Sequence, residues 1–334
     1  MTNTTCKAMT TSAHLIGPGV LRVRNGMPAW EPLEGRSLQL HPERLETLII
    51  YGHGDLTGEA LRLLWRHGVQ VSFLSRSGSR MQGRLSPPAS AAPSLAYLQH
   101  LAAADATFAL AQARHLVEGK IEGTRRVLEH LARHGQGQLG RTRDELKIDL
   151  RRLKKASSLA SLRGHEGAAA ARWHAQMRGL FPAHLPYPGR RCHPATDPVN
   201  ALLSLGYTLL LSRVEAQAAA IGLDPLVGVF HQPRAGKPAL ACDLIEPLRV
   251  PVVDQLVLGQ VKQGFFQPAH FYSADQGVRL HKEHFRRFLE AFEQRYTSQP
   301  THETFETQAR QTVGQFAAAV RVWIGASRSA GVME

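Results

Sequence analysis

Three short segments of the sequence place acidic side chains and a histidine next to apolar or small residues. Glu166 directly precedes a glycine and the alanine run 168–171, His231 ends an apolar stretch, and Asp243 and Glu246 lie three residues apart in another. Carboxylates with one imidazole and no thiolate form a hard donor set that suits Mg²⁺ or Mn²⁺. Such an ion can activate an attacking oxygen and offset charge on a phosphodiester, so these residues indicate phosphodiester chemistry.

Each segment also has a purely structural interpretation. An acidic residue in the first turn of a helix compensates the helix dipole, which would account for Glu166. A lone histidine is more often a packed, hydrogen-bonded residue than a ligand, so His231 alone is weak evidence. Asp243 and Glu246 would share one side of a helical turn, where Arg249 can pair with them. The residues by themselves leave a metal site and a structural ion pair open.

The composition narrows the class of protein. The 334 residues are 43% hydrophobic and carry a net charge of +13, with far more arginine than lysine. This charge is compatible with nucleic acid, an acidic partner, an anionic membrane surface or biased codon usage. The chain contains no apolar run long enough for a membrane-spanning helix and no secretory signal pattern, so we expect a soluble, cytoplasmic protein without a membrane partner. Cys6, Cys192 and Cys242 form no CxxC pair, which disfavours a disulfide framework or a zinc ribbon.

The elements that would position these residues fall into two groups. The first 85 residues have the pattern of strands: Asn25-Gly26 is a hairpin turn signal, 47–51 and 69–73 are apolar strands, and 57–67 is one helix. A Pro/Ala/Ser-rich stretch at 86–93 has the composition of a linker. Beyond it the apolar period is helical, and we expect helices over 101–116, from 127, and over 141–162, 200–221, 252–261, 280–296 and 304–323. The predicted fold is α+β, with a small β-rich domain over 1–88 and a larger all-helical catalytic domain over 89–334.

Taken in order, the motifs resemble those of the CRISPR-associated integrase family, the catalytic subunit of CRISPR spacer acquisition. The most specific block begins with Asp197-Pro198-Val199-Asn200 and continues to Gly206-Tyr207, then runs from Gly222-Leu223-Asp224-Pro225 to His231. It ends with Asp243-Leu244-Ile245-Glu246-Pro247-Leu248-Arg249 and Val253-Asp254. Glu166-Gly167 before an alanine-rich helix matches the family's upstream glutamate motif. The resemblance covers nearly the whole chain.

The resemblance implies a β-sandwich-like N-terminal dimerisation domain and a helical domain that holds one divalent metal, Mg²⁺ or Mn²⁺. Carried over by position, the metal ligands are Glu166, His231 and Glu246, and Asp243 is a nearby acidic member of the catalytic site. The family acts as homodimers, two of which clamp a dimer of a small ferredoxin-like CRISPR-associated partner subunit. It joins the 3′-hydroxyl ends of captured double-stranded DNA to the CRISPR repeat by transesterification, and isolated members are metal-dependent DNA endonucleases.

Four arginines lie near these motifs in sequence and are candidates for contacts with DNA phosphates: Arg163, Arg190, Arg191 and Arg249. Two other functions fit the same residues. One is a metal-dependent nuclease that acts on branched or single-stranded DNA in repair. The other is a non-catalytic DNA-binding scaffold in which the carboxylates form structural ion pairs.

Overall fold

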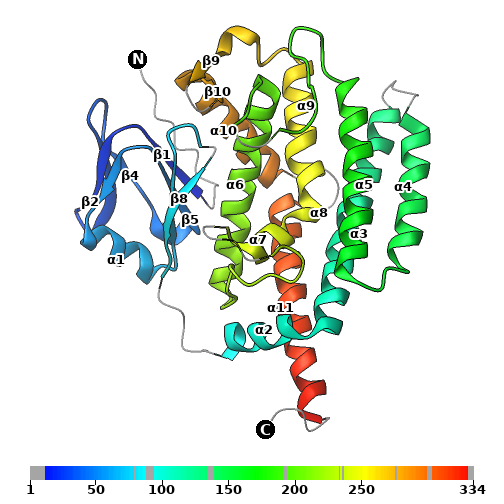
Figure 1. Cartoon of the computed structure of the whole chain (residues 1–334). Helices are drawn as coiled ribbons and strands as arrows, with labels where there is room; N and C mark the ends of the chain where they lie inside the picture. Colours follow the sequence, from blue (N-terminus) through cyan, green and yellow to red (C-terminus); the bar gives the residue numbers. More distant parts are fainter. Residues whose placement is uncertain are drawn as a thin grey trace.

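The computed structural model describes residues 12–78, 80–87, 94–133, 139–191, 194–232, 234, 237–274, 277–298 and 303–329. It confirms a β-rich N-terminal part followed by a mostly helical part, which lie side by side in Figure 1. The predicted boundary at 88/89 falls outside the described residues, as do Cys6 and Cys192. None of the described helices is long and apolar enough to span a membrane.

Two four-stranded sheets build the N-terminal part. One has the order β1 (Ser12–Ile16), β5 (Thr47–Tyr51), β7 (Gln70–Leu74), β8 (Met81–Leu85). The other has the order β4 (Leu38–Gln39), β3 (Met27–Pro32), β2 (Gly19–Arg24), β6 (Gly54–Leu56). The predicted hairpin at Asn25-Gly26 is present: both residues have positive φ, 51° and 75°, as its tight turn requires. A single helix, α1 (Gly58–Arg66), follows β6, as the sequence predicted.

The alternation of side chains along β5 joins the two parts of the chain. Leu48 and Ile50 pack in a small core with residues of both sheets, whereas Ile49 and Tyr51 belong to the large core of the helical part. This is the period of two that a strand buried on both faces produces. The β-rich part therefore packs its second face directly on the helices.

A buried polar network crosses the same contact. His14 on β1 bonds the Tyr51 hydroxyl at 2.8 Å and the Glu293 carboxylate at 3.0 Å, and Arg213 donates to the other oxygen of Glu293 at 2.8 Å. Burial, the largest influence, favours a raised pKa for Glu293, but Arg213 and His14 outweigh it and lower that pKa to about 2. The two parts of the chain are thus joined by charge as well as by apolar packing.

The helical part differs from the predicted pattern in several places. Its helices are α2 (Ser94–Ala104), α3 (Ala106–Arg133), α4 (Gly140–Leu153), α5 (Leu159–Arg178), α6 (Pro198–Ala220), α7 (Ala239–Leu244), α8 (Glu246–Leu248), α9 (Gln255–Lys262), α10 (Lys282–Thr297) and α11 (Phe305–Ser329). The predicted helix over 141–162 is wrong: it is two helices, because the Ser158 side chain caps a new N-terminus at α5. The predicted helix over 101–116 is also wrong: it is divided between α2 and α3, because the Asp105 side chain caps the N-terminus of α3. Helix α3 then continues past 127, where a new helix was expected, and a hairpin of β9 (Phe271–Ala274) and β10 (Gly277–Leu280) interrupts the helices.

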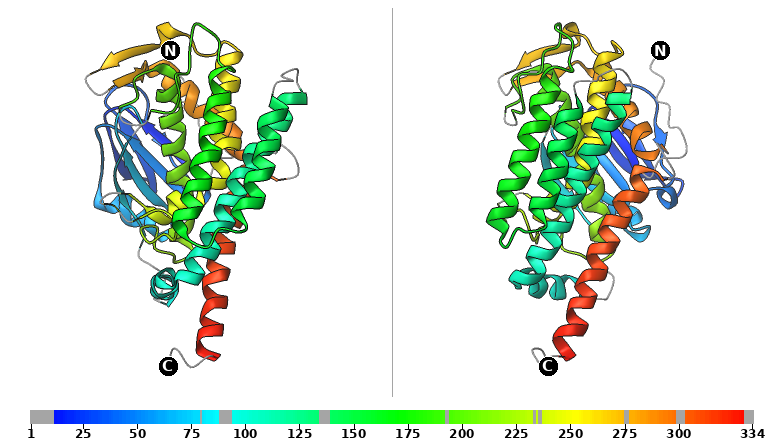
Figure 2. Two further views of the ribbon diagram at one scale, coloured as in Figure 1. Left: turned by 45° about the vertical axis from the view of Figure 1, so that its right-hand side comes forward. Right: turned by 90° about the vertical axis from the view of Figure 1, so that its right-hand side faces the viewer.

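The helices that carry the candidate residues pack against one another. Helices α3, α4 and α5 lie together on the side away from the sheets, and α8 and the π-helical turn η3 (Arg249–Asp254) pack on α3 (Figures 1 and 2). Pro247 and Pro251 interrupt regular α-helical hydrogen bonding along 246–254, since proline lacks the backbone N–H. The long helix α11 runs down to the C-terminus, past α2.

Candidate metal centre

His231 is held in a fixed orientation by Asp243. Its Nδ1–H donates to Asp243 Oδ1 at 2.7 Å, and its own backbone N–H donates to the same oxygen at 2.8 Å. Asp243 Oδ2 accepts the backbone N–H groups of Val229 at 2.7 Å and Phe230 at 3.0 Å. Because Nδ1 carries the proton, the lone pair of Nε2 is free for a ligand, and the ring is 40% exposed.

The turn before His231 is built to accommodate this carboxylate. Asp243 is completely buried, and a Cβ at Gly228 would lie 2.5 Å from its Oδ2, so only glycine leaves room for it. Buried Gln99 on α2 fixes the other end of the turn by donating to the carbonyls of Asp224 at 2.9 Å and Val227 at 2.7 Å. Asp243 therefore positions the His231 ring through its contact with Nδ1.

Glu246 approaches the same imidazole from the other side. Its Oε1 lies 3.9 Å from His231 Nε2 and accepts from Arg249 at 2.7 Å. Glu246 is only 2% exposed, and burial favours a raised pKa, but Lys120 and Arg249 outweigh it and lower the pKa to about 2. Glu246 is ionised at neutral pH. The sequence prediction that Asp243 and Glu246 share one side of the chain is confirmed, since both face His231.

Glu166 lies beyond the first turn of α5, so the helix-dipole interpretation of this residue is wrong. The helix begins at Leu159, and Glu166 instead forms an ion pair with Lys120 of α3. The Lys120 ammonium also lies 2.5 Å from Glu246 Oε2. Lys120 thus bridges Glu166 and Glu246.

The close approach of α3 to α8 brings Lys120 to this position. Gly119 and Gly123 flank it on α3, and a Cβ at either would lie 3.0 Å from an atom of Pro247. Small residues four apart on one face let two backbones approach closely. Lys120 therefore lies next to Glu246, the residue before Pro247. The sequence motifs did not single out Lys120. The pair of glycines around a lysine was the signal that could have drawn attention to it.

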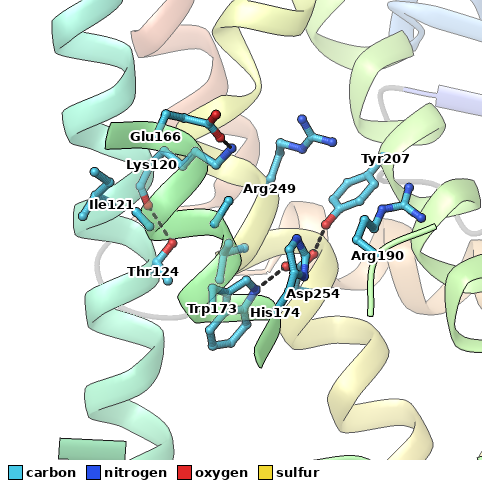
Figure 3. Close-up of a pocket in the computed structure, with 13 residues that line it drawn as sticks. Lys120, Ile121, Thr124, Glu166, Trp173, His174, Arg190, Tyr207, Arg249 and Asp254 are labelled. Carbon is cyan, nitrogen blue, oxygen red and sulfur yellow. Dashed lines mark hydrogen bonds and ion pairs between the residues drawn. The ribbon is translucent and has the colours of Figure 1, made fainter. Parts of the chain in front are cut away.

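A cavity opens beside this bridge, and Figure 3 shows the side chains that surround it. Arg190 and Arg249 both lie over the ring of Tyr207, at 5.1 and 4.5 Å from its centroid. The Tyr207 hydroxyl and Trp173 Nε1, the latter at 2.6 Å, donate to buried Asp254. The cavity is lined by Lys120, Ile121, Thr124, Glu166, Ala169, Ala170, Trp173, His174, Arg190, Tyr207, Arg249, Val250 and Asp254. Lys120, Arg190 and Arg249 make the lining basic, which suits a phosphate group.

The donor set fits a hard divalent ion. Among the described residues, no three His, Cys, Asp or Glu side chains form a ready-made metal-ligand group, because Lys120 lies between Glu166 and Glu246. Glu246 Oε2 is buried and ion-paired with Lys120, yet no donor is aligned to hydrogen-bond it. An ion about 2.1 Å from each ligand atom spans up to about 4.2 Å, which accommodates the 3.9 Å between His231 Nε2 and Glu246 Oε1.

The four candidate phosphate-binding arginines lie in different environments. Arg163 donates to the carbonyl of Phe230 at 2.8 Å, and Arg249 pairs with Glu246. Arg190 donates to the Asn200 side chain at 2.9 Å, whereas the side chain of Arg191 is exposed. Arg190 and Arg249 line the cavity, and Arg163 braces the segment that carries His231. The DNA contacts themselves stay a prediction.

Comparison with known families bears directly on this site. The sequence profile of the family described as "CRISPR associated protein Cas1" matches residues 14–294. The chain belongs to the Cas1 family. It is 37% identical over 311 residues to the CRISPR-associated endonuclease Cas1 1 of Thermus thermophilus, which covers 89% of this chain and 93% of the relative. It is 32% identical over 267 residues to a Cas4 exonuclease/Cas1 endonuclease fusion of Geobacter sulfurreducens, covering 77% of this chain and 47% of the fusion.

Solved structures show the same fold. A Cas1 protein from Thermotoga maritima superposes with a TM-score of 0.81 at 20% identity, covering 92% of this chain and 96% of that one. A casposase bound to its integration product superposes with a TM-score of 0.78 at 24% identity, covering 92% and 90%. The Cas1 match spans both the β-rich part and the metal-centre residues of this chain.

Proposed function

We propose that this Cas1-family chain is the metal-dependent DNA integrase of CRISPR adaptation, with DNA endonuclease activity at the same site. The observation that carries the proposal is the convergence of His231 Nε2, buried Glu246 and Glu166 beside a basic cavity. The relatives named as Cas1 endonucleases and the structural similarity to a casposase bound to its integration product support it.

Glu166, His231 and Glu246 would hold one Mg²⁺ or Mn²⁺. When bound, the ion supplies Lewis-acid activation of a 3′-hydroxyl or water and offsets charge on the phosphate. The chain's own residues prepare the site: Asp243 keeps the His231 proton on Nδ1, and Arg249 holds Glu246 Oε1. In the joining reaction, the 3′ oxygen of a captured DNA fragment bonds to phosphorus in the repeat while the repeat's own phosphorus–O3′ bond breaks.

The DNA partner follows from the charge and the cavity. The net charge of +13 supplies sequence-independent attraction to phosphates, and Arg190 and Arg249 add positive charge to the lining of the cavity. We place Arg163, Arg190, Arg191 and Arg249 at the phosphate contacts, and the reaction in the cytoplasm.

The assembly is part of the same proposal. The chain superposes on part of a chain in a structure described as a Cas6-RT-Cas1–Cas2 complex, with a TM-score of 0.83 at 23% identity over 97% of this chain and 36% of that one. We propose that this protein forms homodimers through its β-rich part and binds a small ferredoxin-like Cas2-type subunit, so that two copies hold the two ends of one DNA fragment.

Strand transfer into a repeat-containing plasmid tests the proposal. His231→Ala is expected to abolish joined product in Mg²⁺ or Mn²⁺, because the imidazole ligand is lost. His41→Ala, an exposed histidine paired with Glu43, serves as the matched control and is expected to join normally. Full joining by folded His231→Ala would overturn the site assignment. Cleaved but never joined strands from the unaltered protein would favour the repair nuclease instead. Calorimetry that shows no Mn²⁺ binding would favour the non-catalytic scaffold.

A further inference from the structure

We propose that Lys120 and the catalytic metal share one position, so that metal binding expels the Lys120 ammonium from between Glu166 and Glu246 into the neighbouring cavity. This inference rests on the proposed function, because it concerns the same metal. It assigns Lys120, a residue outside the ligand set, as an internal counter-ion that the metal replaces.

The first observation is the position of the ammonium. Lys120 forms ion pairs with Glu166 and, at 2.5 Å, with Glu246 Oε2, while its side chain is 13% exposed. Two carboxylates of a buried site repel each other unless a cation lies between them, and Lys120 supplies that cation.

The second observation is one of space. A divalent ion lies about 2.0–2.2 Å from its carboxylate oxygens, and Lys120 Nζ already lies 2.5 Å from Glu246 Oε2. An ion bound by both Glu166 and Glu246 would compete with the ammonium for these two carboxylates. Two positive charges so close together repel strongly at the low effective dielectric of a buried site. The ammonium and the metal therefore exclude each other.

The third observation is that Lys120 has a place to go. Its side chain lines the cavity that also contains Arg190, Arg249 and Tyr207, and Figure 3 shows it beside that space. A lysine stem is flexible, with rotatable bonds that can swing the ammonium away from the carboxylates. Once there, the ammonium would add to the positive charge that faces a DNA phosphate. Metal binding would thus strengthen DNA binding through Lys120.

Calorimetric titration with Mn²⁺ tests the exclusion. Lys120→Met removes the competing charge and is expected to bind Mn²⁺ about tenfold or more tightly than the unaltered protein. Lys262→Met, at an exposed lysine of α9, is the matched control and is expected to leave the affinity unchanged. Lys120→Gln gives a second uncharged variant should Lys120→Met fail to fold. Equal or weaker Mn²⁺ binding by the folded Lys120 variant would overturn the inference.

A separate control distinguishes this failure from failure of the proposed function. If the unaltered protein and Glu246→Gln bind Mn²⁺ alike, the metal site itself is wrong, and both proposals fall. If Glu246→Gln loses the ion but Lys120→Met does not gain affinity, only the role of Lys120 is wrong.

Amine-selective labelling with mass spectrometry follows the ammonium directly. Mg²⁺ is expected to raise the labelling rate of Lys120 in the unaltered protein several-fold, because the amine leaves its ion pairs, while exposed Lys262 labels equally with and without the metal. An unchanged or lower rate at Lys120 under Mg²⁺ concentrations that saturate binding would contradict its expulsion.

Discussion

Replacing Asp243 with asparagine changes a single buried atom of the site, and its effect can be worked out from the contacts. Oδ2 accepts two backbone N–H groups, from Val229 and Phe230. Oδ1 accepts two more donors, the backbone N–H and the ring Nδ1–H of His231. An asparagine has one acceptor oxygen and one donor amide, so it can satisfy only one of these two pairs.

The magnitude follows from the pair that is lost. A hydrogen bond to a charged group contributes about 1.5–3 kcal/mol, and two of them are left facing an amide that donates rather than accepts. We expect Asp243→Asn to lower the free energy of unfolding by about 3–6 kcal/mol. If the amide faces His231, the ring also loses the contact that fixes its tautomer, and we expect metal affinity to fall about 10- to 100-fold.

Urea unfolding followed by circular dichroism measures the first quantity, and Mn²⁺ titration of the folded variant measures the second. Asp144→Asn, at an exposed aspartate of α4 that pairs with Arg143, is the matched control and is expected to leave the stability nearly unchanged. A loss below about 1 kcal/mol for Asp243→Asn, with unchanged Mn²⁺ affinity, would refute the assignment of Asp243 as the residue that positions His231.

Three further outcomes are expected. Arg213 and His14 hold the pKa of Glu293 at about 2, below its ordinary 4.5. Its contribution of about 3 kcal/mol to the free energy of unfolding is therefore present above pH 4.5 and is lost as pH falls toward 2. Glu293→Gln should show a shallower fall in this free energy over the same pH range, and an unchanged slope would refute the network. Gly228→Ala places a Cβ 2.5 Å from Asp243 Oδ2 and should lower the free energy of unfolding by about 1–3 kcal/mol. Gly259→Ala, whose Cβ meets no atom within 4 Å, should not destabilise α9. Equal melting temperatures for the two variants would count against the tight packing at Gly228. Chelation with EDTA should stop strand transfer without altering the circular dichroism spectrum, and added Mg²⁺ or Mn²⁺ should restore joining; joined product in EDTA would contradict a metal requirement.

Local patterns in the sequence predicted much of the fold. Asn25-Gly26 specified a hairpin because both residues tolerate positive φ, and the apolar run 47–51 specified a buried strand. The helix ends were harder. The capping hydroxyl of Ser158 separates α4 from α5, but serines among basic and apolar residues are a weak signal beside the continuing helical period. The hairpin of β9 and β10 is short, and its strands carry no long alternation.

The candidate site was predictable only in part, for a physical reason. The spacing of Asp243 and Glu246 places both on one side of the chain, because residues three apart are separated by a single turn. Two other features depend on contacts between segments 12 to 126 residues apart. Asp243 accepts the three consecutive backbone N–H groups of 229–231, and Lys120 reaches Glu246. The Cas1 resemblance gave the ligand set by position, but the counter-ion and the role of Asp243 required the structure.

Anomalous diffraction at the manganese edge, from crystals soaked in Mn²⁺, would locate the metal ion itself. We expect one strong peak about 2.0–2.3 Å from His231 Nε2 and from carboxylate oxygens of Glu166 and Glu246, with the Lys120 ammonium displaced into the cavity. A peak at other residues, or none at saturating Mn²⁺ with Lys120 still between the two glutamates, would contradict it.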